Sequence, residues 1–197
     1  MKVSLYPCFK HWTEFQNIWI YSDPHFSDAE SQYFRRNYPG DEEQVKRINS
    51  KVGKRDMIIF LGDICNTEYI KQIKGYKVLV MGNHDKGASN YIKNVINGTS
   101  NRLFDEVYEG PVIINDRIII SHEPFLSPYL FNIHGHVHAG VSGAVLPGAW
   151  NCCAEHLDYY PISLKTIIES GRLREIETLH RQTIDKATIK SMKKKVT

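Results

Sequence analysis

Three short apolar runs, each followed closely by side chains that can bind a cation, are the feature that most constrains the fold of this chain. The runs and their polar successors are residues 17–21 before Asp23 and His25, residues 56–61 before Asp63, and residues 76–81 before Asn83 and His84. Continuous apolar runs of this length are typical of strands buried on both faces, in a sheet that helices cover. They predict a layered α/β domain.

Two further segments have the same character. Residues 112–120 are apolar with a polar interruption, which predicts a hairpin whose second strand runs into His122. Residues 131–138 predict another strand, with two histidines near its end. Every strand expected after the first three therefore also leads to a possible metal ligand.

Helical patterns lie between the expected strands. Asp41 is expected to cap a helix in which Val45, Ile48 and Val52 recur at helical spacing. The other expected helices are residues 89–96, residues 163–168 before Gly171, and a helical extension within residues 172–197.

Seven Asp, Asn and His side chains are expected to meet in space, because the carboxyl ends of strands in an α/β sheet share the edge where ligands bind. They are Asp23, His25, Asp63, Asn83, His122, His136 and His138. With His84 added, five of the nine histidines of the chain follow these strands. A single histidine of this kind is more often structural, but the ordered set favours a metal site.

The donors favour two divalent cations rather than one. Residues at i and i+2 of an extended segment point the same way, so Asp23 and His25 are expected to bind one ion together, and His136 and His138 to share a side of their strand. Two cations bridged by one carboxylate use all seven side chains. The donors are oxygens and imidazole nitrogens, which favours manganese, with iron, zinc, nickel or magnesium as alternatives.

Five motifs in this order resemble those of the calcineurin-like metallophosphoesterases. They are Asp23-x-His25, Gly62-Asp63, Gly82-Asn83-His84-Asp85, His122, and Gly135-His136-Val137-His138. The resemblance extends from about residue 17 to residue 170. The sequence around the motifs is similar to those of a small bacterial and phage branch of predicted phosphoesterases.

The resemblance implies a single-domain, four-layer αββα sandwich and a role for each residue. Asp23, His25, Asp63 and His138 would hold the first metal; Asp63, Asn83, His122 and His136 would hold the second, with Asp63 as the bridge. A metal-bridging hydroxide would attack phosphorus in line, and His84 would assist the leaving group.

Length and charge place the domain within residues 1–185. A chain of 197 residues is long enough for one domain with a sizeable core. The net charge of +3 comes from residues 186–197, which hold five lysines and no acid. We expect this basic tail to be solvated and disordered, and the alternative is a nucleic-acid-binding arm.

The cysteine spacing and the apolar runs argue against a disulfide- or zinc-stabilised fold and against a membrane-spanning protein. Four cysteines without CxxC spacing predict reduced thiols rather than a disulfide framework or a zinc knot. No stretch reaches the ~20 apolar residues of a membrane span. The first residues lack the apolar run of a signal peptide, which predicts a cytoplasmic protein. The oligomeric state stays open.

Four functions remain in competition. The 14 residues from His122 to His136 leave no room for an inserted lid, and an uncovered site favours a phosphodiester, such as a cyclic or short nucleotide. A phosphomonoester substrate is nearly as well supported. A non-catalytic interaction module, like the retromer subunit that resembles these enzymes, would be expected to lack metal-binding residues. Here all seven candidate ligands and His84 are present. A nuclease would carry extra domains, and here only the lysine-rich tail favours nucleic acid.

Four other residues each have more than one possible role. Asp85 either closes a turn or orients His84. His134 is expected to be structural or to support a metal ligand. Arg35 and Arg36 are expected to be an exposed pair on a helix, and the alternative is contact with a substrate phosphate.

Overall fold

The computed structural model describes residues 4–33, 35–85, 89–96, 98, 102–139 and 146–176. The lysine-rich tail, the domain boundary at residue 185 and most of the helical extension expected within residues 172–197 lie outside this part of the chain. None of the helices in the described ranges is long and apolar enough to cross a membrane.

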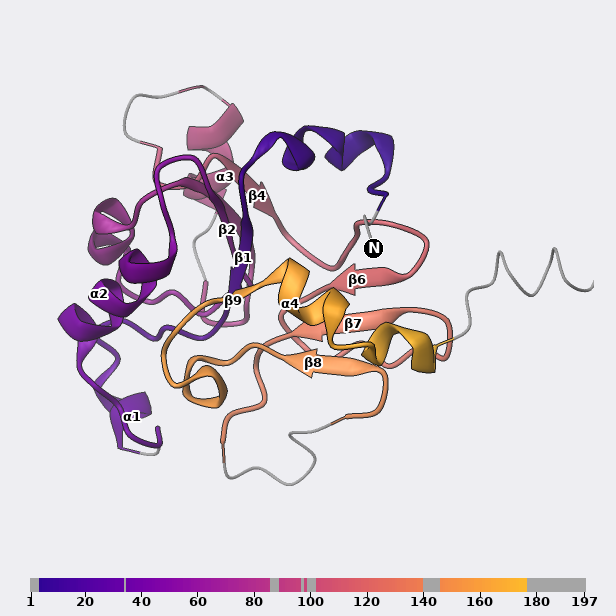
Figure 1. The fold of residues 1–197 in the computed structure, drawn as a ribbon. Helices are drawn as coiled ribbons and strands as arrows, with labels where there is room; N and C mark the ends of the chain where they lie inside the picture. Colours follow the sequence, from indigo (N-terminus) through magenta and orange to yellow (C-terminus); the bar gives the residue numbers. More distant parts are fainter. Residues whose placement is uncertain are drawn as a thin grey trace, which may run out of the picture.

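Two β-sheets packed against each other form the centre of the molecule (Figure 1). The first sheet has five strands in the order β4 (Glu106–Tyr108), β3 (Tyr76–Val80), β2 (Met57–Phe60), β1 (Ile18–Tyr21) and β9 (Ile162–Ser163). Strands β1 to β4 are parallel, and only β9 runs antiparallel to its neighbour. The carboxyl ends of the first three strands therefore lie at one edge.

The second sheet has four strands and supplies the rest of that edge. Its order is β5 (Val112–Ile113), β6 (Ile118–Ile120), β7 (Phe131–His134) and β8 (Ala149–Asn151). Strands β5 and β6 form the expected antiparallel hairpin, whereas β6, β7 and β8 are parallel. The expected strand at 131–138 is too long, because β7 ends at His134 and the backbone turns at His136, whose φ is 65°.

An apolar core holds the two sheets together. Alternate residues such as Ile20 and Ile59 of the first sheet pack in one cluster with Ile120 and Ile133 of the second, and all four are fully buried. Burial of a side chain of this size contributes about 1.5–3 kcal/mol relative to exposure. The period of two along each strand thus places one face of each sheet in a shared core.

Helix α2 (Asp41–Lys51) covers the outer face of the first sheet together with the 3-10 helix η2 (Thr67–Gln72). Val45 and Ile48 pack there against Phe60 in a second apolar cluster. The expected cap was wrong by one residue: Gly40 is the N-cap, and Asp41 begins the helix. Acidic residues in the first turn still favour this helix, because they face its positive end.

Shorter helices complete the layers. They are η1 (Pro7–Glu14), α1 (Ala29–Gln32), α3 (Ser89–Ile96), η3 (Ala154–Leu157), α4 (Leu164–Glu169) and η4 (Arg172–Glu175). Helices α3 and α4 confirm two predictions, and α4 begins after Ser163, whose side chain accepts a hydrogen bond from the Thr166 N–H. Figure 1 shows α2 and α3 beside the first sheet, and α4 contacts β1 and β9 of the same sheet. The predicted single-domain α/β sandwich is confirmed.

Hydrogen bonds at Ser22 also join the two sheets. Ser22, directly after β1, donates its N–H to the carbonyl of Cys152 and accepts from the N–H of Ala154. Both partners follow β8 in the second sheet, so this bridge ties the end of β1 to the end of β8. The loop that carries Asp23 begins at this bridge.

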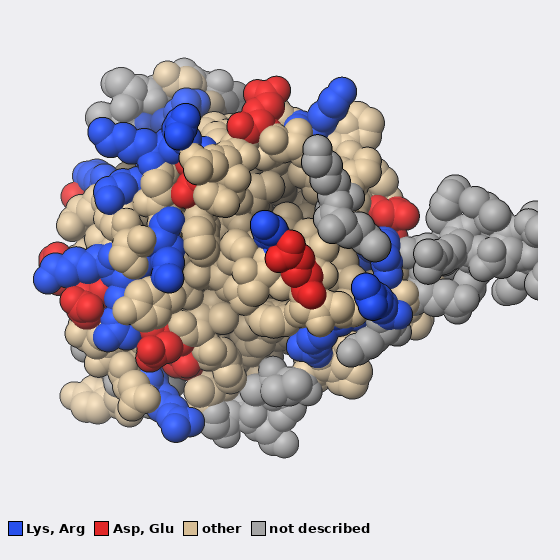
Figure 2. All heavy atoms as spheres, viewed as in Figure 1, with Lys and Arg blue, Asp and Glu red and all other residues tan. Residues whose placement is uncertain are grey.

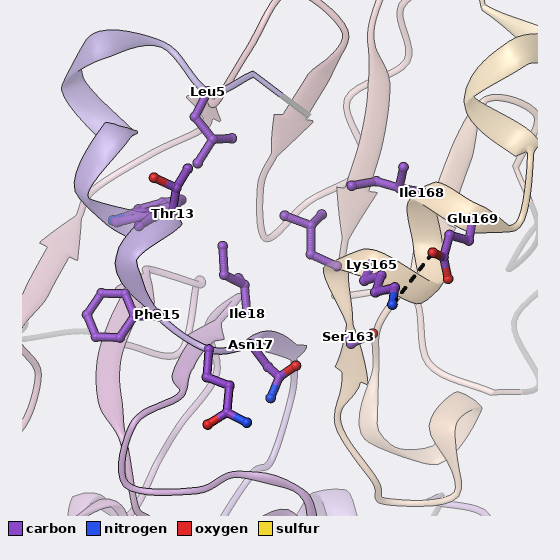
Figure 3. A pocket seen from close by; sticks show the side chains of 12 residues that line it. Leu5, Thr13, Phe15, Asn17, Ile18, Ser163, Lys165, Ile168 and Glu169 are labelled. Carbon is purple, nitrogen blue, oxygen red and sulfur yellow. Dashed lines mark ion pairs between the residues drawn. The ribbon is translucent and has the colours of Figure 1, made fainter. Parts of the chain in front are cut away.

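A larger groove lies at the opposite end of β1. It has a volume of about 480 Å³ and lies between η1 and α4, with Leu5, Phe15 and Ile168 among its apolar walls (Figure 3). Lys165 and Glu169 form an ion pair at its rim. Asn17 and Ile18 line this groove at the start of β1, whereas the predicted metal ligands follow its end. The groove is therefore separate from the candidate site.

Candidate metal centre

The loops that follow the strands bring all seven predicted ligands and His84 to one place. A cavity of about 180 Å³ opens there, lined by His25, Asp28, Glu30, Ser31, Asp63, Asn83, His84, His136 and His138. Asp23 and His122 complete the site; both are buried, beneath the residues that line the cavity. This cavity is smaller than the apolar groove, but it is the one in which the possible ligands converge.

Strained backbone shapes these loops. Asp23, His25, Asp63 and His136 all have φ between 42° and 65°, in the left-handed region that residues with a Cβ rarely adopt. Such strain is typical of functional sites, where the surrounding structure holds it in place. The extended geometry expected for residues 23–25 is therefore wrong, although the two side chains do converge as predicted.

The first cluster consists of Asp23, His25 and His138. Their ligand atoms lie within 4.8 Å of one another, and the Oδ1 of Asp23 is 3.6 Å from the Nε2 of His138 and 3.9 Å from that of His25. The Asp23 Oδ1 and the His25 Nε2 are buried and have no hydrogen-bond partner. Buried polar atoms without partners are rare and costly, so a group that binds both is expected between them.

The second cluster consists of Asn83, His122 and His136. The Nε2 of His122 lies 2.9 Å from the Oδ1 of Asn83 and 3.0 Å from the Nδ1 of His136. The Nδ1 of His122 faces the carbonyl of Leu61 at 2.7 Å and donates to it, which leaves a lone pair on Nε2. A lone pair that faces an amide oxygen at this distance is repulsive, and a cation between the two atoms would relieve the repulsion.

Asp63 lies between the two clusters. Its Oδ2 is 3.6 Å from the Nε2 of His25 in the first cluster and 3.4 Å from the Nε2 of His122 in the second. Its Oδ1 accepts a hydrogen bond from the backbone N–H of His84 at 2.8 Å. One oxygen is thus held by the protein, and the other faces both clusters, as a bridging ligand requires.

The donor set fits divalent cations. It combines carboxylate and amide oxygens with imidazole nitrogens in two groups that share a carboxylate, which matches first-row divalent ions. The buried unpaired atoms of Asp23 and His25 fit the same interpretation. The first cluster and Asp63 would hold one ion, and the second cluster and Asp63 the other.

The imidazoles of the first cluster are oriented by carboxylates that the sequence did not indicate. The Nδ1 of His25 is 3.0 Å from Asp28, and the Nδ1 of His138 is 2.6 Å from Glu155. A carboxylate on one ring nitrogen fixes the tautomer and directs the other nitrogen at the metal. Asp28 follows His25 by three residues, but no sequence pattern connects Glu155 with His138.

Charges in this region shift several pKa values. Burial lowers the pKa of His25, although Asp23 and Asp63 oppose the shift. Burial also acts to lower the pKa of His138, but its hydrogen bond with Glu155 and the negative charges of Asp23 and Glu155 together outweigh this and raise the pKa. Burial alone would raise the pKa of Glu155, whereas the bond from His138 and its charge hold that pKa at about 2. Glu155 is therefore an anion at neutral pH.

Asp85 closes the turn after β3, which confirms one of its two readings. Its carboxylate accepts hydrogen bonds from the backbone N–H groups of Gly82, Asp63 and Ile64 at 2.7, 2.9 and 3.0 Å. Burial nevertheless raises its pKa. These bonds fix the loops after β2 and β3 together, so Asp85 supports the position of Asp63 rather than the ring of His84.

His84 lies at the mouth of the cavity and is exposed. Its ring centre is 5.2 Å from that of His25, and the two rings are nearly perpendicular. An exposed imidazole beside the candidate ion sites can reach a substrate without competing for a ligand position. This arrangement suits proton donation to a leaving oxygen.

Two glycines allow the loops to pack closely. A Cβ at Gly135 would collide with the side chains of Ser22 and Asp23. A Cβ at Gly82 would collide with the Oδ1 of Asp63 and would lie 2.9 Å from the ring of His122. The motif glycines are therefore needed because the ligand side chains occupy the space.

Three predictions about other residues have clear outcomes. Arg36 is exposed as expected, but Arg35 is buried, so the prediction of an exposed pair was wrong for Arg35; its guanidinium donates to the Pro24 carbonyl at 2.7 Å. His134 is fully buried and bonds the Gly135 carbonyl at 2.8 Å, which confirms a structural role. All four cysteines are free, as expected; Cys153 is buried, and its Sγ donates to Asp23 at 3.2 Å.

Fold and site together define an α/β-sandwich protein with two clusters of possible metal ligands at the ends of its strands. The sequence pattern that describes calcineurin-like phosphoesterases matches residues 16–195. The chain belongs to the calcineurin-like phosphoesterase family. Its clusters and its family indicate a metal-dependent hydrolase of phosphate esters.

A solved structure supports the fold. The chain is similar to the crystal structure of a protein of unknown function from Aquifex aeolicus, with a TM-score of 0.62 and 25% sequence identity. The similarity covers 78% of this chain and 98% of the other. No curated protein matches the chain at a significant level.

Proposed function

We propose that the protein is a phosphodiesterase that uses two divalent cations, with His84 as the catalytic histidine. The observation that carries the proposal is the position of Asp63, whose Oδ2 faces His25 at 3.6 Å and His122 at 3.4 Å. When bound, two divalent cations would supply positive charge for a phosphate and a nucleophilic water at neutral pH. Manganese suits the oxygen and imidazole donors, with iron, zinc, nickel or magnesium as alternatives.

The residues of this chain would divide the remaining work. The buried side chains of Asp23 and His25 would hold the first ion away from bulk water, and the exposed side of the cavity would admit the substrate. His84, at that side, would donate a proton to the leaving oxygen. The hydrogen bond from its backbone N–H to Asp63 keeps this histidine next to the shared carboxylate.

The charge around the cavity favours a diester over a monoester. Among the described residues that line the cavity, Asp28, Glu30 and Asp63 are acidic and none is Lys or Arg. A monoester carries up to two negative charges, and its extra charge usually requires a basic side chain. A diester carries one charge and has bulk on both sides of phosphorus, which an uncovered site accommodates.

Nucleic acid is less well supported as a substrate. Figure 2 shows Lys and Arg side chains scattered among Asp and Glu on one face, without a continuous basic band. A nonspecific nucleic-acid site requires such a band along the path of the backbone. A small-molecule or nucleotide phosphodiester therefore remains the proposed substrate class.

The test is hydrolysis of bis-p-nitrophenyl phosphate and p-nitrophenyl phosphate by the full chain, with each metal in turn. The proposal predicts activity that requires added metal, is highest with manganese and is higher on the diester. A strong preference for the monoester would contradict the substrate class. No metal-dependent hydrolysis of either compound would favour an interaction module on the same fold.

His84→Asn tests the assignment of the catalytic histidine. We expect kcat to fall by about 10²–10⁴-fold, the usual contribution of a general acid, without loss of bound metal. His11→Asn is the matched control, because His11 is also partly exposed but contacts Glu106 in the first sheet, away from the site. Unchanged kcat in His84→Asn would show that the assignment is wrong.

A further inference from the structure

Two charged side chains that belong to neither cluster are buried beside the first one. Arg35 and Glu155 are separated widely in sequence, and both side chains are 0% exposed. Charged residues are almost never fully buried unless they are paired, because removing each charge from water costs several kcal/mol. Their burial therefore needs a structural explanation.

Glu155 holds the loop that carries His138. Its Oε1 accepts hydrogen bonds from the Nδ1 of His138 at 2.6 Å and from the backbone N–H of Ala139 at 3.1 Å. The first bond fixes the imidazole ring, and the second fixes the backbone next to it. With Nδ1 occupied, the Nε2 of His138 points toward Asp23 at 3.6 Å.

Arg35 holds the loop that carries Asp23. Its guanidinium donates to the backbone carbonyl of Pro24 at 2.7 Å and to that of Asp23 at 3.3 Å. A third bond, at 3.3 Å, goes to the side chain of Gln44 on α2. The buried guanidinium of Arg35 thus holds the strained backbone at Asp23 in place.

The two side chains also face each other. The Nε of Arg35 is 3.9 Å from the Oε2 of Glu155, and neither atom has another hydrogen-bond partner. The pair therefore connects the loop after β1 with the loop after β7, which supply Asp23 and His138 to the first cluster.

The second cluster is held differently. Its His122 is oriented by the backbone carbonyl of Leu61 at 2.7 Å. Within the described part of the chain, no buried pair of opposite charges makes a hydrogen bond to Asn83, His122 or His136. A change in the Arg35–Glu155 pair should therefore act directly on the first cluster; the second is linked to it by the hydrogen bond from the backbone N–H of His136 to the Oδ2 of Asp23, at 2.9 Å, and keeps its own side-chain contacts.

We propose that Arg35 and Glu155 are positioning residues that set the affinity of the first cluster for its cation and leave that of the second cluster unchanged. This inference rests on the proposed function, because it assumes that both clusters bind metal. Loss of an outer carboxylate partner of a metal-binding histidine typically weakens metal binding by 10–100-fold. The same loss is expected here for one of the two ions.

The experiment is a titration with Mn²⁺ of the full chain from which a chelator has removed metal. Isothermal calorimetry measures the heat of binding, and electron paramagnetic resonance measures the concentration of free Mn²⁺. The wild-type protein should bind two ions. Glu155→Gln should bind one of them about 10–100-fold more weakly and the other with unchanged affinity. Glu109→Gln, the same change at an exposed residue outside the site, should match the wild type.

Single-site backgrounds identify which ion is affected. In His122→Ala only the first cluster keeps its histidines, and adding Glu155→Gln should weaken the remaining ion. In His138→Ala only the second cluster is complete, and adding Glu155→Gln should have no effect. Equal weakening in both backgrounds would indicate general destabilisation and would overturn the inference.

The remaining outcomes are equally decisive. No Mn²⁺ binding by the wild type would refute the proposed function itself, whereas two ions bound normally by Glu155→Gln would refute only the inference. If Glu155→Gln does not fold, Arg35→Lys serves instead, because lysine keeps the charge but cannot reach both carbonyls. Selective weakening of one ion in Arg35→Lys would support the inference, and unchanged or equal affinities would overturn it.

Discussion

The two halves of the candidate metal centre use similar ligands but differ in their surroundings. In the first cluster Asp23 and His25 are almost completely buried, at 0% and 3% exposure. In the second cluster Asn83 and His136 are exposed, and only His122 is buried. The first half is therefore the more buried of the two, although His25 and His138 line the same cavity as Asn83 and His136.

The groups behind the ligands differ as well. Carboxylates of Asp28 and Glu155 orient the imidazoles of the first cluster, whereas a neutral backbone carbonyl orients His122 in the second. A carboxylate raises the basicity of its imidazole more than a carbonyl does. Of the two proposed ions, we therefore expect the one in the first cluster to be held more tightly and the one in the second to exchange more readily.

Asp63→Asn should have the largest effect, because Asp63 is the one side chain that both halves share. The substitution removes the negative charge from the oxygen that faces both clusters, so we expect loss of both ions and hydrolysis at background level. Metal content after gel filtration and turnover of bis-p-nitrophenyl phosphate measure this. Asp116→Asn in the exposed hairpin turn is the control, and normal occupancy in Asp63→Asn would contradict a bridging role.

Glycine substitutions should separate the halves by steric means. Gly135→Ala would push a methyl group into Asp23, and Gly82→Ala would push one into Asp63 and His122. Overpacking of this kind costs about 1–3 kcal/mol of unfolding free energy. We expect Gly135→Ala to weaken the first ion and Gly82→Ala to weaken both, by metal titration and urea denaturation.

Gly110→Ala is the matched control for both substitutions. A Cβ at Gly110 would meet no heavy atom within 4 Å. This variant should retain the stability and the metal affinity of the wild type. Equal losses in all three variants would show that the close approach of the ligand loops is not the cause.

Removal of metal should show the difference as two steps. A ligand present at 100 times its Kd stabilises a folded protein by about 2.7 kcal/mol, and at this chain length each kcal/mol shifts Tm by about 2–4 °C. With increasing chelator, Tm should fall first when the second cluster loses its ion and again when the first cluster does. Differential scanning calorimetry measures Tm at each chelator concentration. A single step in Tm would mean that the two clusters do not differ in metal affinity.

Asp28→Asn should have the smallest effect and the most selective one. Its carboxylate orients His25 at 3.0 Å and also caps α1 by accepting from the N–H groups of Glu30 and Ser31. Asparagine retains the cap, so the loss is confined to the charge behind His25. We expect about 10–100-fold weaker binding of the first ion with unchanged Tm of the metal-free protein. A change in the second ion instead would contradict the division into halves.

The ligand residues could be predicted from sequence because of where they stand relative to apolar runs. Asp63 and Asn83 follow strands that are buried on both faces, and such runs are visible without a structure. The convergence of Asp23 and His25 was predicted for the wrong reason. An extended segment was assumed, whereas left-handed φ angles of 55° and 42° bring the side chains together.

The supporting residues could not be predicted from sequence. Glu155 lies in a short 3-10 helix that has no strong local pattern, and it acts on His138 only through the packing of distant segments. Arg35 appeared to be exposed because it stands beside another arginine, but a carboxylate 120 positions further along the chain compensates its burial. Strands β4, β8 and β9 were missed for a related reason: at two or three residues each, they are too short to show a period.

The position of the centre between two sheets has a further consequence. Asp63 and Asn83 follow strands of the first sheet, whereas His122 and His136 follow strands of the second. Besides hydrogen bonds such as those at Ser22 and between His122 and Leu61, hydrocarbon side chains such as Ile59 and Ile120 keep these sheets at their separation. The spacing of the two proposed cations would therefore depend on the bulk of aliphatic groups in the interior, and conservative replacements there would change the chemistry without altering a ligand.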